Sequence, residues 1–146
     1  MRLLSLALFA SLLPTLALAD VDTILADAAK LCSEQDNGVF GSEGAVRQID
    51  LTGDGKPDTL VDEGIFTCST AASLFGGSGG SMIHILANDT QSSYLVQGYE
   101  TTTWAGSLIL LLAQHGSNCN ATGVLPCFEA LTWGEDSFLS VRPQTP

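Results

Sequence analysis

The pattern of hydrophobic and polar residues changes once along this chain, from a helical period to a strand period. Between Val21 and Leu31 the apolar side chains recur at steps of three and four residues, and Asp20 or Asp22 can cap the first turn. We therefore predict one short amphipathic helix here. Beyond Cys32 the apolar residues occur in short runs separated by Gly, Asn, Asp and Ser, which is typical of β-strands joined by turns.

Seven of these runs are predicted to be strands: Ala45–Asp50, Thr59–Val61, Ser81–Ala87, Ser93–Glu100, Ser107–Gln114, Pro126–Thr132 and Phe138–Val141. The segments Asn88–Gln91 and Gly134–Ser137 have the composition of hairpin turns. The run from Leu108 to Leu112 lacks polar alternation, so we expect it in the middle of a sheet with both faces covered, although a helix could show the same run. The predicted fold is α+β, mainly β, with an N-terminal helix packed on an antiparallel, meander-like sheet.

The first residues have the composition of a targeting segment. Met1 and Arg2 provide a positive start, an apolar run follows, and residues 17–19 read Ala-Leu-Ala, the small-x-small form of a cleavage site. We expect residues 1–19 to be a signal peptide and residues 20–146 to be a single exported domain, periplasmic or secreted. A membrane anchor is the alternative, but serines, a threonine and Pro14 interrupt a run that is barely long enough to span a bilayer.

Acidic residues greatly outnumber basic ones. Sixteen Asp and Glu residues stand against five Lys and Arg, so the formal net charge is −11 at pH 7, and removal of Arg2 makes it −12. A nucleic-acid binder needs Lys or Arg to displace counterions, and an anionic membrane surface makes the same demand. We therefore expect no nucleic-acid partner and no membrane insertion after signal removal.

Four cysteines lie beyond the predicted signal peptide. An even number in an exported chain predicts two disulfides, and three pairings are open. Cys119 and Cys127 flank a turn-rich stretch, which favours a local bridge and leaves Cys32 to pair with Cys68. The spacings do not resemble a zinc site, because no CxxC pair occurs.

The segment from Asp50 to Asp58 places oxygen-bearing side chains at alternate positions around a glycine turn. Calcium prefers six to eight oxygen ligands, which Asp and Thr side chains and a backbone carbonyl can supply. The predicted metal ligands are the side chains of Asp50, Thr52, Asp54 and Asp58 and the carbonyl of Lys56. The segment is not an EF-hand, because Val61 stands where that motif requires Glu. An Asp/Gly turn without a cation is the alternative.

This segment resembles the calcium loop of FG-GAP/VCBS-type repeats, whose usual form is Asp-x-Asn/Asp-x-Asp-Gly-x-x-Asp followed by a strand. The resemblance implies a local calcium loop and not the propeller that several repeats build. Two further segments, Cys-Ser-x-x-x-Ser-Leu-Phe-x-Gly-Ser-Gly-Gly at 68–80 and Gln-His-Gly-x-x-Cys at 114–119, are similar to those of a group of small secreted bacterial proteins. That group often has cysteines where this chain has Gly76 and Ser81, and the resemblance implies no activity.

A hydrolase-like pattern also occurs. Residues 76–80 satisfy Gly-x-Ser-x-Gly with Ser78 at the centre, and Asp89 and His115 follow in the order of a catalytic triad. The pattern requires a buried strand before the serine and a helix after it, whereas Ser78 lies among four glycines. We therefore interpret this segment as a flexible loop.

The histidines and tryptophans have plain interpretations as well. We interpret His84 and His115 as strand or turn residues satisfied by hydrogen bonds, with His115 the better candidate for a functional role because strand ends can face pockets. Trp104 and Trp133 could form a ligand platform, but core packing or cover of a sheet edge is the commoner use of aromatic residues in a small β domain.

These features predict a small exported, non-enzymatic domain with one structural calcium loop, which recognises a protein or glycan at the cell envelope. One alternative is a periplasmic inhibitor of a cationic enzyme such as lysozyme, whose association the negative charge would assist. The second alternative is a small serine or metal-assisted hydrolase that uses Ser78 or a water molecule near His115.

Overall fold

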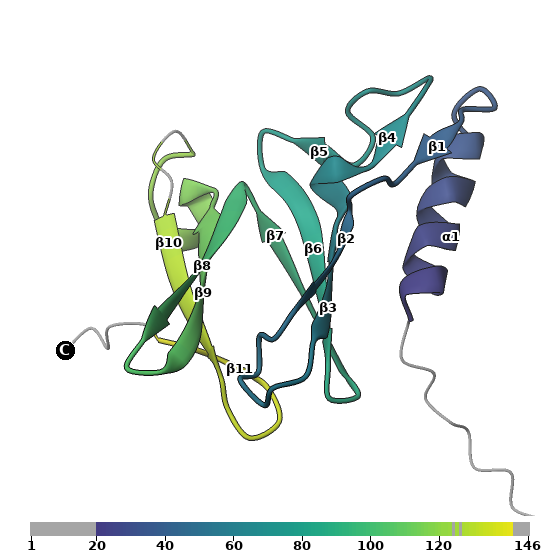
Figure 1. Ribbon diagram of the computed structural model, residues 1–146. Helices are drawn as coiled ribbons and strands as arrows, with labels where there is room; N and C mark the ends of the chain where they lie inside the picture. Colours follow the sequence, from purple (N-terminus) through teal and green to yellow (C-terminus); the bar gives the residue numbers. More distant parts are fainter. Residues whose placement is uncertain (1–19, 124, 126, 142–146) are drawn as a thin grey trace, which may run out of the picture.

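The computed structural model describes residues 20–123, 125 and 127–141. They form three layers, which are one α-helix, a first antiparallel sheet and a second antiparallel sheet (Figure 1). The predicted α+β, mainly β class with an N-terminal helix packed on antiparallel strands is thus confirmed. The predicted signal peptide lies outside the described residues.

Helix α1 (Val21–Ser33) begins at a side-chain cap. The carboxylate of Asp20 accepts hydrogen bonds of 2.9 Å from the backbone N–H and from the hydroxyl of Thr23. The backbone hydrogen bond is the main reason why the pKa of Asp20 is lowered. The buried positions recur at every fourth residue, so they form one stripe that faces the sheet, and they are Ile24, Ala28 and Cys32.

The first sheet contains β2 (Val46–Ile49), β3 (Asp58–Asp62), β5 (Gly76–Gly77), β6 (Gly80–Ala87) and β7 (Thr90–Val96). Strand β6 pairs with β7 on one side and with β3 and β5 on the other, since Ser81 lies between Gly76 of β5 and Val96 of β7. A two-stranded ribbon of β1 (Phe40–Gly41) and β4 (Thr67–Cys68) lies beside it, and the short 3-10 helix η1 (Glu63–Ile65) follows β3.

The second sheet contains β8 (Gly98–Trp104), β9 (Ser107–Gln114), β10 (Cys127–Trp133) and β11 (Phe138–Ser140), in the order β11-β10-β9-β8. A second 3-10 helix, η2 (Gly116–Cys119), follows β9. Both predicted hairpin turns are present: Asn88 and Asp89 adopt positive φ between β6 and β7, and residues 134–137 join β10 to β11.

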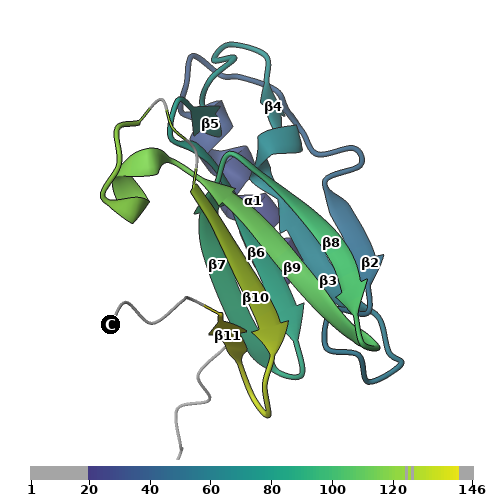
Figure 2. The ribbon, with the colours of Figure 1, turned by 90° about the vertical axis from the view of Figure 1, so that its left-hand side faces the viewer.

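Two hydrophobic clusters hold the layers together. The cluster between α1 and the first sheet includes Ile24, Ala28, Ala45, Val61 and Phe66. The larger cluster lies between the two sheets and includes Leu51, Leu60, Ile83, Ile85, Leu110 and Leu112. Strand β3 contributes to both, because adjacent residues of a strand point to opposite faces, and Leu60 and Val61 are each 0% exposed. Figure 2 shows the second sheet in front of the first, with α1 behind both.

The segment Ser93–Glu100, predicted as one strand, is two strands in different sheets. The chain leaves β7 at Val96 and enters β8 at Gly98, with Gln97 between them. The backbone N–H of Gln97 donates a 2.7 Å hydrogen bond to the carbonyl of Ala113 in β9. Gly80 permits this corner, because a Cβ atom at that position would lie 2.0 Å from the carbonyl oxygen of Val96.

The apolar run in β9 lies in the middle of the second sheet, but the described residues cover only one of its faces. Leu110 and Leu112 are buried in the cluster between the sheets, whereas Ile109 and Leu111 point to the opposite face and are half-buried. The expectation of two covered faces is therefore wrong for this strand.

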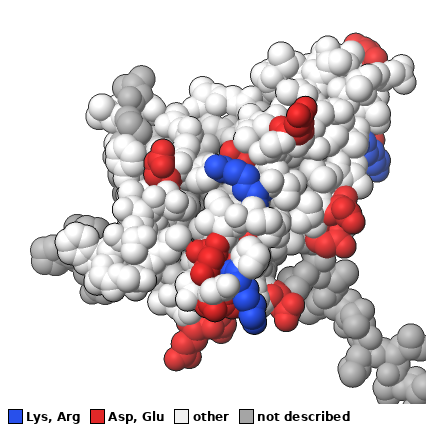
Figure 3. Space-filling view, in the orientation of Figure 1, with Lys and Arg blue, Asp and Glu red and all other residues white. Residues whose placement is uncertain are grey.

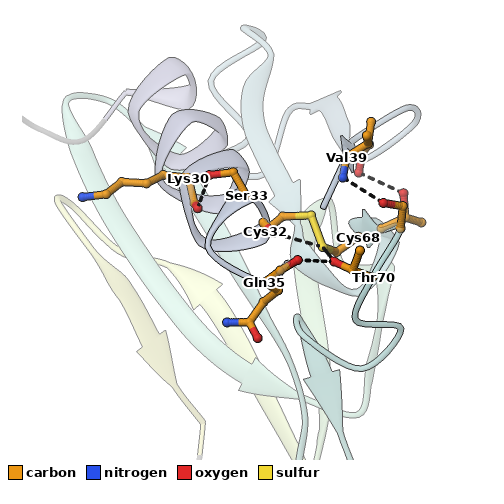
Figure 4. Close-up of a disulfide and its surroundings, with 10 residues drawn as sticks. Lys30, Cys32, Ser33, Gln35, Val39, Cys68 and Thr70 are labelled. Atoms are coloured by element: carbon orange, nitrogen blue, oxygen red, sulfur yellow. Dashed lines mark hydrogen bonds between the residues drawn. A yellow bond between two sulfur atoms is a disulfide. The ribbon is translucent and has the colours of Figure 1, made fainter. Parts of the chain in front are cut away.

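Both predicted disulfides are present, Cys32–Cys68 with Cα atoms 5.6 Å apart and Cys119–Cys127 with Cα atoms 6.2 Å apart. The first ties the end of α1 to β4, and the hydroxyl of Thr70 donates a hydrogen bond to the carbonyl of Gln35 beside it (Figure 4). The disulfides indicate an oxidising compartment outside the cytoplasm. In the described part of the chain, no helix is long and apolar enough to cross a membrane.

Gly38 packs against the first disulfide, since a Cβ atom there would lie 2.6 Å from Sγ of Cys68 and 2.7 Å from the carbonyl oxygen of Cys32. We expect Gly38→Ala to lower the free energy of unfolding by about 2 kcal/mol through overpacking. Urea unfolding followed by circular dichroism measures this. Gly77→Ala is the matched control, because a Cβ atom at Gly77 meets nothing within 4 Å. Equal stability of the two variants would contradict the assigned packing.

Candidate functional site

The predicted calcium ligands all lie in or next to one turn, residues 50–57, which we call the acidic turn. It joins β2 to β3, whose last and first residues, Ile49 and Asp58, are paired across the sheet. Gly53 and Gly55 adopt positive φ values of 77° and 85°, a conformation that glycine adopts without strain. The sequence prediction that this segment is a tight glycine turn is thus confirmed.

Backbone N–H groups surround the carboxylates of the acidic turn. Oδ1 of Asp50 accepts a hydrogen bond of 2.7 Å from the N–H of Gly53, and its Oδ2 accepts one of 3.0 Å from Gly55. Oδ1 of Asp54 accepts from the N–H of Lys56 at 2.7 Å. These bonds hold the turn closed through the chain's own groups.

Asp58 is the anchor of this turn. It is only 6% exposed, and its Oδ2 accepts hydrogen bonds of 2.7 Å and 2.9 Å from the N–H groups of Leu51 and Thr52. A carboxylate that receives two backbone N–H groups is well compensated even when buried. Asp58 therefore joins the start of β3 to the start of the turn.

The oxygen atoms of these side chains determine whether a cation could bind in the acidic turn. Oδ2 of Asp54 and Oδ1 of Asp58 take no part in the hydrogen bonds above, and Thr52 adds a hydroxyl oxygen 3.5 Å from Oδ1 of Asp50. Among the described residues, no group of three or more His, Cys, Asp or Glu side chains is placed to hold a metal ion together. The donors are hard oxygens of the type that calcium prefers, and the calcium site stays a prediction.

The hydrolase-like residues do not meet. Ser78 lies in the turn before β6 and Asp89 in the turn after it, so a strand that spans about 25 Å separates them. The side-chain amide of Gln97 donates a 2.9 Å hydrogen bond to the carbonyl of Ser78, and Nδ1 of His115 lies 2.7 Å from Oγ of Ser117. Ser78 and Asp89 therefore cannot belong to one triad.

His84 has two partners that the sequence interpretation did not name. Its Nε2 lies 2.8 Å from Oε1 of Glu63, and its Nδ1 lies 2.9 Å from Oγ of Ser93. The two-residue turn at Asn88 and Asp89 could have revealed the second contact, since it places His84 directly opposite Ser93. Both ring nitrogens are satisfied, so we interpret this group as a link between η1, β6 and β7.

The second sheet has an outer face, directed away from the first sheet, that no described element covers. Helix α1 covers the corresponding face of the first sheet instead (Figure 1). The apolar residues directed outward are Trp104, Ile109, Leu111, Ala113, Phe128, Ala130 and Leu139. Trp104 is 75% exposed and Phe128 is 72% exposed. Sequence reasoning could not find this face, because an exposed apolar strand and a covered one have the same composition.

A hollow of about 340 Å³ lies on this outer face, bordered by Gly98, Glu100, Leu111, Ala113 and Phe128. The four strands of the sheet contain no lysine or arginine, and Glu100 and Glu129 are their only charged residues. Glu129 is turned to the other face, where its carboxylate accepts a 2.8 Å hydrogen bond from Gln114. Glu100 is therefore the one charged side chain of these strands that is directed outward.

Acidic residues also gather in the turns at one end of the two sheets. The residues are Asp50 and Asp54 in the acidic turn, Asp89 between β6 and β7, and Glu135 and Asp136 between β10 and β11. Two of these turns touch, because the hydroxyl of Thr90 donates a 3.4 Å hydrogen bond to the carbonyl of Asp136. Figure 3 shows acidic side chains around a basic one at the lower end of the view, where these turns lie.

Comparisons with family models, with curated proteins and with solved structures find no match for this chain. The resemblance of the acidic turn to FG-GAP/VCBS-type loops therefore stays a prediction, and function has to be argued from the geometry of the described residues.

The hydrogen bonds of Asp58 lead to a prediction about stability. Asp58→Ala leaves two backbone N–H groups without their acceptor, so we expect it to lower the free energy of unfolding by about 3 kcal/mol. Asp54→Ala removes one local bond in an exposed turn and is expected to cost about 0.5 kcal/mol. Urea unfolding in buffer with a chelator compares the two without any contribution from a cation. A smaller loss for Asp58→Ala than for Asp54→Ala would refute the assigned role of Asp58.

Proposed function

We propose that this protein is an exported, non-enzymatic binding module that recognises a basic protein at the cell envelope. The observation that supports this proposal is the outer face of the second sheet, where Trp104 and Phe128 are exposed beside Ile109 and Leu111. Contiguous apolar patches are rare on monomeric proteins and mark interaction sites, and aromatic residues are enriched at the centres of interfaces.

The charge of the molecule indicates the kind of partner. A net charge of −11 and the acidic turns at one end would attract a basic protein and repel nucleic acid or an acidic protein. The apolar outer face would then provide the contact area that holds the complex together. A periplasmic or secreted inhibitor of a cationic enzyme is a special case of this function, and lysozyme is an example of such an enzyme.

We also propose that the acidic turn binds calcium as a structural ion, through the side chains of Asp50, Thr52, Asp54 and Asp58 and the carbonyl of Lys56. The support is the alternate spacing of hard oxygen donors and the repulsion among the carboxylates, which a divalent cation would reduce. Since backbone N–H groups already close the turn, calcium would stiffen it rather than create it, and the fold would persist without the ion.

The calcium proposal predicts a change in thermal stability. Extracellular calcium sites often have dissociation constants near 1 mM, so about 5 mM calcium should add about 1 kcal/mol and raise the melting temperature by about 4 °C. Differential scanning calorimetry in chelator and then in calcium measures the shift. Asp54→Asn should keep the melting temperature in chelator and lose most of the response to calcium. A melting temperature that is unchanged up to millimolar calcium would exclude the site.

The binding proposal is tested by capture from an envelope extract of the producing organism, with calcium present and then removed. The immobilised protein is expected to retain a basic protein saturably and to release it as salt increases, because screening weakens charge attraction. Phe128→Ala and Trp104→Ala should each weaken this binding about tenfold, as expected for aromatic anchors.

Val39→Ala is the matched control for this experiment. Val39 is 72% exposed, as Phe128 is, but it lies next to β1 and outside the outer face. Binding that is reduced by Phe128→Ala and retained by Val39→Ala supports the outer face as the interface. The proposed function would be refuted if Phe128→Ala, Trp104→Ala and Val39→Ala all left the binding unchanged, or if no basic protein bound saturably.

A further inference from the structure

We infer that the hollow on the outer face of the second sheet takes an arginine side chain of the basic partner. This inference rests on the proposed function and names the chemistry of one contact within it. The hollow has a volume of about 340 Å³, which is ample for one side chain. Its border combines an apolar floor, an aromatic ring and a carboxylate.

The register of the strands explains why a hollow exists here. Gly98 lies opposite Ala113, and Ala113 lies opposite Phe128, so one row across β8, β9 and β10 contains no side chain, a methyl group and a ring. The next row begins with Glu100 opposite Leu111. The low point over Gly98 and Ala113 is therefore bounded by Phe128 on the side of β10 and by Glu100 and Leu111 along the strands.

The dimensions of the hollow suit a long side chain. Neighbouring strands are about 4.8 Å apart and two residues span about 6.8 Å along a strand, so Phe128 on β10 and Glu100 on β8, which are two strands and one row apart, are separated by about 12 Å. An extended arginine can place its methylene stem on Leu111 and Ala113 and bring its guanidinium group to Glu100. Phe128 would then exclude water from the opposite side.

The charge of the hollow indicates a cation. Glu100 is exposed, and among the described residues no basic side chain forms an ion pair with it. Arginine fits this carboxylate better than lysine, because its planar guanidinium group can form two parallel hydrogen bonds and is more weakly hydrated than an ammonium group.

A second copy of this chain is a poor occupant. Each copy has a net charge of −11, so two copies repel each other. The guanidinium group of Arg47 already lies over the ring of Tyr99, at 5.0 Å from its centre, and Lys56 stands between Asp54 and Asp58 in the sequence of the acidic turn. A basic partner can supply the missing cation without these costs.

The experiment uses the full exported chain labelled with ¹⁵N and a small probe, N-acetyl-arginine N-methylamide. Titration should shift the backbone amide signals of Gly98, Leu111 and Ala113 in a saturable manner. The citrulline analogue has nearly the same shape without the charge, so it should bind about tenfold more weakly. Shifts of equal size with both compounds, or no saturable shift with arginine, would overturn the inference.

Two substitutions and one matched control locate the probe. Glu100→Gln should weaken arginine binding about tenfold, and Ala113→Leu should block it by filling the hollow while the spectrum stays well dispersed. Glu135→Gln removes the same charge from an exposed turn at the acidic end and should change the affinity less than about twofold. Equal effects of Glu100→Gln and Glu135→Gln would overturn the inference.

The outcome also separates this inference from the proposed function. If Phe128→Ala abolishes capture of a basic protein while the arginine probe does not bind the hollow, the interface stands and the arginine contact is wrong. If no basic protein binds at all, the proposed function itself is wrong.

Discussion

The rest of this molecule depends on one constraint: in the described part of the chain, a single α-helix is available to cover two sheets. The first sheet is packed on both faces, by α1 on one side and by the second sheet on the other, and Leu60 and Val61 in β3 show this by being completely buried. No described element is left to cover the outer face of the second sheet. The exposed aromatic residues Trp104 and Phe128 are a direct result of this arrangement.

The acidic turn depends on the same packing. Strand β3 is held between two layers, and Asp58 at its start is buried with it, so the carboxylate of Asp58 needs hydrogen-bond donors inside the protein. The N–H groups of Leu51 and Thr52 provide them. The acidic turn is therefore formed by the hydrogen bonds of the fold itself. Any cation that binds there adds to an arrangement that the backbone already stabilises.

Most of the local structure was predictable because it depends on neighbours in sequence. The helix begins at Val21 as the cap and the apolar spacing predict, strand β9 has the predicted bounds, and both disulfide pairings follow from the distribution of turns. The hairpin at Asn88 and Asp89 also has the predicted position.

The sequence predictions failed at positions whose structure depends on residues far away in the sequence. The corner at Gln97 depends on Gly80, which lies in another strand and leaves room for the carbonyl of Val96. Strand β9 carries apolar residues on both of its faces. No local sequence pattern shows whether another layer of the protein covers its outer face. The contact of His84 with Glu63 likewise needs the fold, because η1 lies far from β6 in sequence.

The apolar outer face and the high negative charge are best understood together. An exposed apolar sheet would normally promote self-association, but two copies that each have a net charge of −11 repel one another. The same negative charge attracts a basic partner instead of repelling it. The charge therefore selects which proteins can reach the apolar surface. Specificity then comes from the penalty against wrong partners as much as from contacts with the right one. The outer face of the second sheet lacks basic residues and carries Glu100 beside an apolar hollow. It therefore combines a charge that selects the partner with an apolar surface that holds it.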